Sequence, residues 1–275
     1  SRFTNFLFFC AKNFIKINYS FISTAHNVFP NLHKFGFWPE NTICVSSPVE
    51  KYISSISDTN TEIIHNSINS KNIDVSKKDL KNELGIPHDA ILLINIGRLT
   101  KQKFQLNILN AIKILETSKA TINKYFVIIV GDGQKKSELI ENIQINKINN
   151  RVKLLGERND IQELLSISDI FLLSSKWEGL PLTILEASSY SLPIISMDVG
   201  GVSDFITHEE NGFLVTADDI QNFSLFMKEL INNGNLRKKI GDKAKDTFEL
   251  KFSMSDFINN TINKYQMVHA QGNNK

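Results

Sequence analysis

The stretch Ala90-Ile-Leu-Leu-Ile-Asn-Ile96, followed at once by Gly97, decides the fold class of this chain. A continuous apolar run of this length is typical of a strand covered on both faces, as in a parallel sheet. The segment 106–115 then repeats its apolar residues with helical spacing, and a second apolar run follows at 125–130. Strand, helix and strand in this order predict a βαβ unit.

The same alternation extends in both directions. Further short apolar runs predict strands at 152–155, 170–173, 193–196 and 212–215, with helical segments between them. Before residue 85 the pattern is less regular, and polar connections rich in Ser, Asn and Lys, at 54–60 and 66–78, separate apolar stretches at 21–25 and 42–46 and a weaker one at 62–65. We therefore predict an α/β fold with parallel sheets, in a chain that divides near residue 85.

Composition excludes several classes of function. The 275 residues carry 31 basic and 29 acidic side chains, and this formal charge of +2 gives no reason to expect a nucleic-acid partner. The two cysteines, Cys10 and Cys44, make neither a disulfide framework nor a cysteine metal site, which favours a reducing cytoplasm. No run approaches the roughly 18 apolar residues of a membrane span.

The first residues form a separate feature. Apolar residues at 3, 6, 7, 10, 14 and 17 have helical spacing, and the segment lacks the small-residue cleavage site of a signal peptide. A core-facing amphipathic helix is the simpler interpretation. The alternative is a membrane-surface helix, with phenylalanines in the headgroup layer and Lys12 and Lys16 at its rim.

Parallel sheets bind ligands beyond the carboxyl ends of their strands, so the segments that follow each apolar run are the places to look for chemistry. After 90–96, Arg98 and Lys103 can converge on one anionic group, the arginine as a bidentate fork and the lysine as a point charge. A solvated basic loop is the alternative. The next turn, Gly131-Asp132-Gly133, lacks the third glycine of a dinucleotide site, so a structural turn is favoured and an NAD enzyme disfavoured.

The most informative segment is Ser174-Ser-Lys-Trp-Glu-Gly-Leu-Pro-Leu-Thr-Ile-Leu-Glu186. It predicts a strand end, a turn around Gly179 to Pro181 and a helix from about Leu182, whose amino end suits a phosphate. Glu186 lies one turn into an otherwise apolar helix, where burial without a partner would be costly. A ligand that bears hydroxyl groups would be such a partner. The alternative, which the spacing favours equally, is that the Glu186 carboxylate is exposed to solvent.

Two other positions follow predicted strands. His26 ends an apolar run, where its side chain can point into a cleft, although a lone histidine is more often structural. Gly200 and Gly201 follow the 193–196 run and indicate either close backbone approach or a plain turn. The other histidines have no metal-ligand spacing: His33, His65, His88, His208 and His269.

Together these residues resemble glycosyltransferase family 4, a family of retaining enzymes with the GT-B fold of two facing Rossmann-like domains. The resemblance covers about residues 20 to 265 and is strongest in the Glu-x7-Glu stretch, Glu178 to Glu186. The other matching motifs, in order, are His26, Val45-Ser46-Ser47, Ile64-His65-Asn66-Ser67-Ile68, Gly97-Arg98-Leu99 with Lys103, Val130-Gly131-Asp132-Gly133, Leu155-Gly156, Ser168-Asp169, Gly200-Gly201 and Asn211-Gly212.

The resemblance implies a role for each candidate. Arg98 and Lys103 would hold the diphosphate of a UDP- or GDP-linked sugar, next to the backbone of Gly179-Leu180-Pro181. Glu186 would accept hydrogen bonds from the ribose, while Glu178 and His26 would be the catalytic residues beside the transferred sugar. Neither a metal nor a cofactor is implied, because Arg98, Lys103 and the helix dipole would stabilise the departing diphosphate.

The implied organisation is a partial N-terminal acceptor-side domain (1–85), a nucleotide-sugar-binding domain (86–250), and a terminal helix that packs back on the first domain and ends in a polar tail (251–275). Family members usually begin further upstream, so a fragment or a naturally truncated protein is expected. Exposed sheet edges would then need a partner chain or a membrane to cover them. Lys103 is followed by Phe104 where the family usually has glycine.

The expected function is sugar transfer to a glycan or lipid-linked acceptor, in surface polysaccharide, capsule or lipopolysaccharide synthesis, at the cytoplasmic side of the cell membrane. The expected partners are the nucleotide-sugar and that acceptor, with membrane contact of the peripheral kind and no nucleic acid. A non-catalytic donor-binding subunit or remnant is the alternative. A sugar epimerase of the same fold would need a histidine and carboxylates that the sequence does not place.

Overall fold

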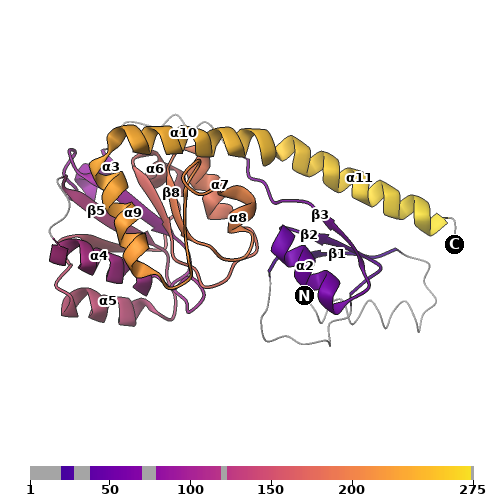
Figure 1. The fold of residues 1–275 in the computed structure, drawn as a ribbon, viewed down its shortest axis with the longest axis horizontal. Coiled ribbons are helices and arrows are strands. Elements are labelled where there is room, and N and C mark those ends of the chain that lie inside the picture. The colour runs from indigo at the N-terminus through magenta and orange to yellow at the C-terminus, as the bar shows by residue number, and fades with distance from the viewer. Residues whose placement is uncertain (1–19, 28–37, 70–78, 119–122, 274–275) are drawn as a thin grey trace.

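The computed structural model describes residues 20–27, 38–69, 79–118 and 123–273. Two parallel sheets organise these residues (Figure 1), which confirms the α/β prediction. We refer to the residues around the first sheet, up to residue 69, as the three-stranded unit, and to residues 79–251 as the six-stranded unit. The helix expected within residues 3–17 lies outside the described residues.

The larger sheet has the strand order β6-β5-β4-β7-β8-β9, and every neighbouring pair is parallel. All six strands lie where the apolar runs predicted them, within one or two residues. Their bounds are β4 Ile91–Ile96, β5 Tyr125–Val130, β6 Val152–Gly156, β7 Ile170–Leu173, β8 Ile194–Met197 and β9 Phe213–Val215.

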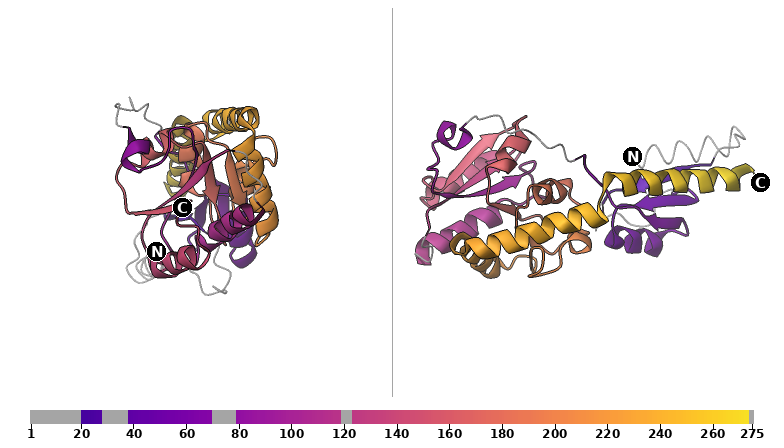
Figure 2. Two further views of the ribbon diagram at one scale, coloured as in Figure 1. Left: turned by 90° about the vertical axis from the view of Figure 1, so that its left-hand side faces the viewer. Right: turned by 90° about the horizontal axis from the view of Figure 1, so that it is seen from above.

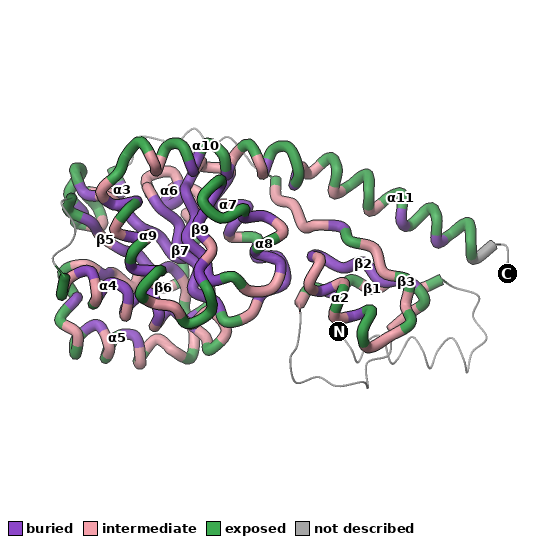
Figure 3. Tube along the Cα trace, in the orientation of Figure 1, coloured by how far each residue is buried: buried purple, intermediate pink, exposed green. Residues whose placement is uncertain are grey.

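Helices cover both faces of this sheet (Figures 1 and 2), which explains why its strands are apolar throughout. Along β4, Leu92 and Ile94 belong to the core on one face and Leu93 to the core on the other. The buried strands form the centre of the unit in Figure 3. The helices are α3 Leu80–Glu83, α4 Leu106–Ser118, α5 Lys136–Ile145, α6 Ile161–Ser166, α7 Leu182–Ser189, α8 Val202–Phe205, α9 Ile220–Asn232 and α10 Gly234–Lys251.

The three-stranded unit contains β1 Ile22–Ala25, β2 Asn41–Cys44, α2 Ser47–Ile56 and β3 Asn60–Ile63, with parallel strands in the order β1-β2-β3. The sequence expectation was wrong at 54–60, because this polar stretch contains the end of α2 and the start of β3. Polar side chains of this stretch bond to neighbours inside the unit: Ser54 Oγ donates to Glu50 Oε1 at 2.9 Å, and Asn60 Nδ2 donates to Asn41 Oδ1 at 3.2 Å.

A long helical segment made of α10 and α11 (Met254–Asn273) runs past both units (Figure 1). From α11, Lys264 Nζ lies 3.2 Å from Glu62 Oε2 of β3, and the Lys264 side chain is only 3% exposed. Val268 is buried as well, and α11 continues to Asn273, so residues 268–273 are helical where a polar tail was expected. Within the described residues, no helix has the length and apolar character needed to cross a bilayer.

Candidate functional site

The order of the larger sheet brings two turns together. The chain proceeds from β4 outward through β5 and β6, then returns to place β7 on the other side of β4. Ligands of open parallel sheets bind at such a reversal, beyond the carboxyl ends of the strands. The turns after β4 and β7 meet here: Ser174 Oγ donates to the carbonyl of Lys103 at 3.0 Å, and the Lys176 amide donates to the carbonyl of Gln102 at 2.8 Å.

Two of the sequence-predicted residues are in direct contact at this junction. Lys103 Nζ donates to Glu178 Oε1 at 2.6 Å, and Ser175 Oγ donates to the same oxygen at 2.6 Å. The side chains of Lys103 and Glu178 are 16% and 7% exposed. A buried carboxylate needs such partners, because desolvation of an unpaired charge is costly. We refer to Lys103, Ser175 and Glu178 as the Lys103–Glu178 cluster.

Phe104 keeps the turn after β4 in an unusual conformation. Its φ of +44° lies in the left-handed region, which a residue other than glycine adopts only with strain. Two contacts hold it there: Ser174 Oγ donates to the Phe104 carbonyl at 3.1 Å, and Lys176 Nζ lies 3.7 Å from the centre of the phenylalanine ring. The residue at which the sequence departs from the family pattern therefore occupies a position that suits glycine.

The helix after β7 begins as the sequence predicted. Pro181 precedes the first residue of α7, Leu182, at the N-cap position. Glu186 lies in the second turn of α7, and burial raises the pKa of its carboxyl above the usual value. Unlike that of Glu178, this carboxylate makes no hydrogen bond or ion pair with the residues that the structure describes; only the backbone carbonyl of Glu186 accepts a hydrogen bond, from Ser189 Oγ at 2.7 Å. The two glutamates of the stretch therefore differ in environment, one partnered and the other half-buried and free to accept hydrogen bonds.

Arg98 is exposed in the turn after β4, with its guanidinium unpaired among the described residues. Its backbone is fixed, because Gln105 Nε2 donates to its carbonyl at 3.2 Å. The neighbouring turn at Gly131 packs tightly beneath it: a Cβ on Gly131 would lie 2.2 Å from the Gly97 oxygen. This close approach agrees with the structural interpretation of the Gly131-Asp132-Gly133 turn.

The two units touch where the residue after β1, His26, meets the turn before α7. A Cβ built on Gly179 would lie 1.9 Å from the backbone oxygen of His26, so no larger residue fits. The His26 side chain itself is exposed. Gly201 is similarly close to the three-stranded unit, since a Cβ there would lie 2.4 Å from Ser46 Cβ. The close-approach interpretation of Gly200-Gly201 thus fits the structure.

Sequence reasoning did not single out two residues of this region. Ser175 was only part of the quoted stretch, and Gln102, whose side-chain amide donates to the Trp177 carbonyl at 2.9 Å, carried no signal beyond its place in a basic turn. No group of acidic, histidine or cysteine side chains among the described residues could hold a metal ion.

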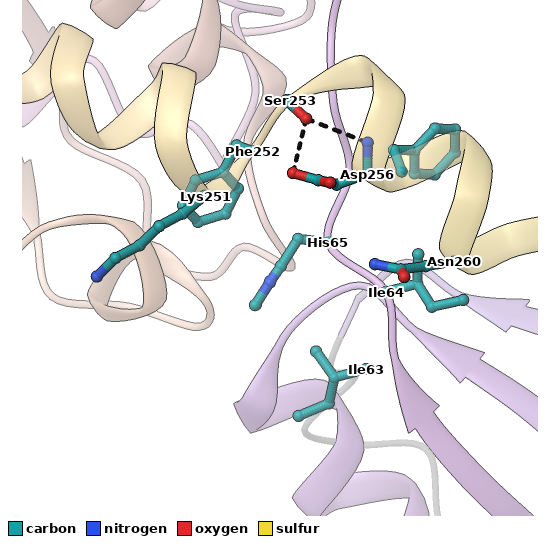
Figure 4. Close-up of a pocket in the computed structure, with 9 residues that line it drawn as sticks. Ile63, Ile64, His65, Lys251, Phe252, Ser253, Asp256 and Asn260 are labelled. Carbon is teal, nitrogen blue, oxygen red and sulfur yellow. Dashed lines mark hydrogen bonds between the residues drawn. The ribbon is translucent and has the colours of Figure 1, made fainter.

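The pocket in Figure 4 is a separate feature, which lies at the junction of β3 and α10 with α11 and is lined by Ile63, Ile64, His65, Lys251, Phe252, Ser253, Asp256, Phe257 and Asn260.

Comparison with known proteins gives a family match and several relatives. The family model described as glycosyl transferases group 1 matches residues 76–247. An Escherichia coli UDP-Gal:alpha-D-GlcNAc-diphosphoundecaprenol alpha-1,3-galactosyltransferase is 35% identical over 193 residues, which are 63% of this chain and 49% of that protein. A Bacillus anthracis N-acetyl-alpha-D-glucosaminyl L-malate synthase is 28% identical over 65% of this chain and 46% of its own length. The chain thus spans about half the length of these two curated relatives.

Solved structures share the whole described fold. The Anabaena HepE structure in complex with UDP superposes with a TM-score of 0.85 at 19% identity, over 97% of this chain and 77% of that one. The same protein in complex with UDP-glucose gives a TM-score of 0.83 at 20% identity, over the same shares of the two chains. At this identity the likeness shows the fold, two facing parallel-sheet units of the GT-B type.

Proposed function

The chain belongs to the group 1 glycosyl transferases, and on that premise we propose that it transfers a sugar from a UDP-sugar to a glycan or lipid-linked acceptor, with retention of anomeric configuration and without a metal ion. The observation that carries this proposal is the Lys103–Glu178 cluster at the sheet reversal. It joins the turns after β4 and β7 and lies beside the amino end of α7.

The diphosphate of the donor would lie among three sources of positive potential. Arg98 supplies an unpaired guanidinium, Lys103 an ammonium, and α7 the unpaired N–H groups and dipole of its first turn. The ammonium has three N–H donors and uses one of them in the bond to Glu178. It can therefore bind phosphate oxygens while it stays bonded to the carboxylate. These groups would stabilise the charge that develops on the departing diphosphate, the task that a metal ion performs elsewhere.

The two glutamates would have different tasks. Glu178, fixed by Lys103 and Ser175, would lie beside the transferred sugar, with the backbone of Gly179, Leu180 and Pro181 next to sugar and phosphate. Glu186 would accept hydrogen bonds from the ribose hydroxyls, the partner that its half-buried carboxylate lacks. His26 would reach the sugar from the three-stranded unit, since its backbone already touches Gly179.

In the reaction, the bond between the anomeric carbon and the diphosphate oxygen would break through an oxocarbenium-like state. The acceptor hydroxyl would attack the same face of the sugar, which gives retention. The names of the relatives favour a bacterial surface glycan as the product: one acts on a diphosphoundecaprenol-linked sugar, and others are named for lipopolysaccharide core and O-antigen biosynthesis. We place the enzyme at the cytoplasmic face of the membrane, where a lipid-linked acceptor would be presented.

Binding and transfer can be tested in separate steps. Calorimetry with UDP, GDP and ADP is expected to show tightest binding for UDP. Incubation with UDP-glucose, UDP-galactose or UDP-N-acetylglucosamine and a diphosphoundecaprenol-linked sugar should release UDP in the presence of EDTA, and proton NMR of the product should show the α-linkage of the donor. UDP binding without release of UDP from any donor would instead assign this chain a donor-binding role, and an inverted linkage would refute retention.

A further inference from the structure

The amino end of α2 is capped by a residue from the other unit. Its own N-cap residue, Ser46, makes no capping bond, and the buried Ser46 hydroxyl has no hydrogen-bond partner in the described part of the chain. Pro48, in the first turn, has no N–H to satisfy. The Ser47 amide donates instead to Oδ2 of Asp204, at 2.6 Å and 157 positions along the chain.

Asp204 belongs to α8 of the six-stranded unit and is nearly enclosed. Its side chain is 11% exposed, and His65 Nε2, at the exit of β3, lies 3.5 Å from the same oxygen. The His65 ring packs against Phe252, with ring centroids 5.1 Å apart, and both lie at the junction of the units in Figure 4. The carboxylate therefore touches the start of α2 and the connection that leaves the three-stranded unit.

Backbone hydrogen bonds connect the region of Ser47 to the end of β1. The residue two before Ser47, Val45, donates its amide to the Ala25 carbonyl at 3.2 Å, and Ala25 directly precedes His26. In the six-stranded unit, Gly201 at the start of α8 donates its amide to the Gly179 carbonyl at 2.6 Å. A short path of backbone contacts thus joins Asp204 to both Gly179 and His26.

A charged acceptor at a helix amino end is favoured twice, by the hydrogen bond and by the helix dipole. Separation of the units would expose Asp204 and leave Ser47 N–H to water. A hydrogen bond to a charged group changes an equilibrium constant by roughly ten- to a hundredfold. The contact is therefore strong enough to decide how often the two units are docked.

We propose that Asp204 is a positioning residue, which caps α2 from the six-stranded unit and so holds the end of β1, with His26, against the turn at Gly179. Its effect on sugar transfer rests on the function proposed above, whereas its effect on docking does not. Asp204 makes no contact with the Lys103–Glu178 cluster among the described hydrogen bonds and ion pairs, so it acts through the placement of the three-stranded unit.

The matched control is Asp219, which caps α9 within the six-stranded unit by accepting a hydrogen bond from the Asn222 amide at 3.1 Å. Asp204→Ala and Asp219→Ala each remove one helix cap, so both should lower the melting temperature by similar amounts. Only Asp204→Ala should enlarge the radius of gyration measured by X-ray scattering of the full chain. It should also raise amide hydrogen exchange across residues 41–53 by about tenfold or more.

Asp204→Asn provides the rescue test, because its side-chain oxygen accepts the same bond without the charge. Asp204→Asn should therefore give an X-ray scattering profile close to that of the wild type. In the transfer assay, Asp204→Ala should lower kcat by about tenfold or more, with the Kd for UDP within about twofold of the wild type. If the scattering and exchange of Asp204→Ala match those of Asp219→Ala, the proposal is wrong. If the wild type binds UDP but transfers no sugar, the proposed function fails, while scattering and exchange still decide the role of Asp204.

Discussion

Replacement of Glu186 by alanine tests whether the half-buried carboxylate of α7 belongs to a ligand. In the free protein this group has no hydrogen bond or ion pair with the described residues, and burial raises its pKa. The Glu186 carboxylate is therefore already partly desolvated in the free protein, before any nucleotide binds. A ribose that offers two hydroxyl groups would gain two charge-assisted hydrogen bonds at this site.

The expected loss follows from those bonds. Each hydrogen bond to a charged group is worth about 1.5–3 kcal/mol, and shared geometry makes the two less than additive. We expect Glu186→Ala to weaken UDP binding by about 2–4 kcal/mol, which corresponds to a roughly 30- to 1000-fold higher Kd. Glu178→Ala should change the Kd by less than about tenfold and act mainly on turnover, because Glu178 faces the sugar in this scheme.

Stability gives an independent signature of the same two sites. Glu186→Gln should raise the free energy of unfolding at pH 7, since it removes an unpaired, partly buried charge. Because burial raises the folded-state pKa of Glu186, this difference is fully present above that pKa and disappears as the pH falls through it towards the usual value of 4.5. Glu178→Ala should instead lower stability, because Lys103 and Ser175 lose their common partner.

Calorimetric titration with UDP, beside urea unfolding at several pH values, measures both quantities. Equal losses of UDP binding in Glu186→Ala and Glu178→Ala would refute the separate roles assigned to the two carboxylates. A Glu186→Gln variant that is less stable than the wild type at pH 7 would refute the claim that this carboxylate is unpaired in the free protein.

Three further predictions concern the same site. Lys103→Ala should raise the Kd for UDP about tenfold and lower the melting temperature, because Glu178 keeps only Ser175 as a partner. The exposed Lys101 should tolerate alanine and serves as the control. Equal effects of the two substitutions in calorimetry and thermal melts would contradict this prediction. Gly179→Ala should lower kcat about tenfold or more with little change in UDP affinity, because the added Cβ would lie 1.9 Å from the His26 oxygen. Its control is Gly234→Ala, where the nearest heavy atom is 3.5 Å away, and a fully active Gly179→Ala would show that the contact is not needed. Finally, UDP affinity should fall as the pH drops through the raised pKa of Glu186, because the protonated carboxyl accepts hydrogen bonds poorly. In Glu186→Gln, only the pH dependence due to the terminal phosphate of UDP, with its own pKa of about 6, should remain. Identical pH profiles of UDP affinity in the wild type and in this variant would refute the assignment.

Local sequence patterns were enough to predict the strands of the larger sheet and the residues of the donor-side turns. Apolar runs such as Tyr125–Val130 became strands because both of their faces are covered, and that requirement is written locally in the residues. Local signals also placed the start of α7 after Pro181. They failed at 54–60, where polar residues form regular structure and their side chains bond to other residues of the three-stranded unit, Ser54 to Glu50 and Asn60 to Asn41.

Which turns meet depends on how the whole chain packs. Lys103 and Glu178 are 75 positions apart and become partners because β7 returns to lie beside β4, an order that periodicity does not encode. The bond from Ser47 to Asp204 joins two units over 157 positions, and no motif marks either residue as a partner of the other. Secondary structure follows from neighbours along the chain, whereas a site at a sheet reversal depends on strand order and on how two units dock, which are set by the packing of the whole molecule.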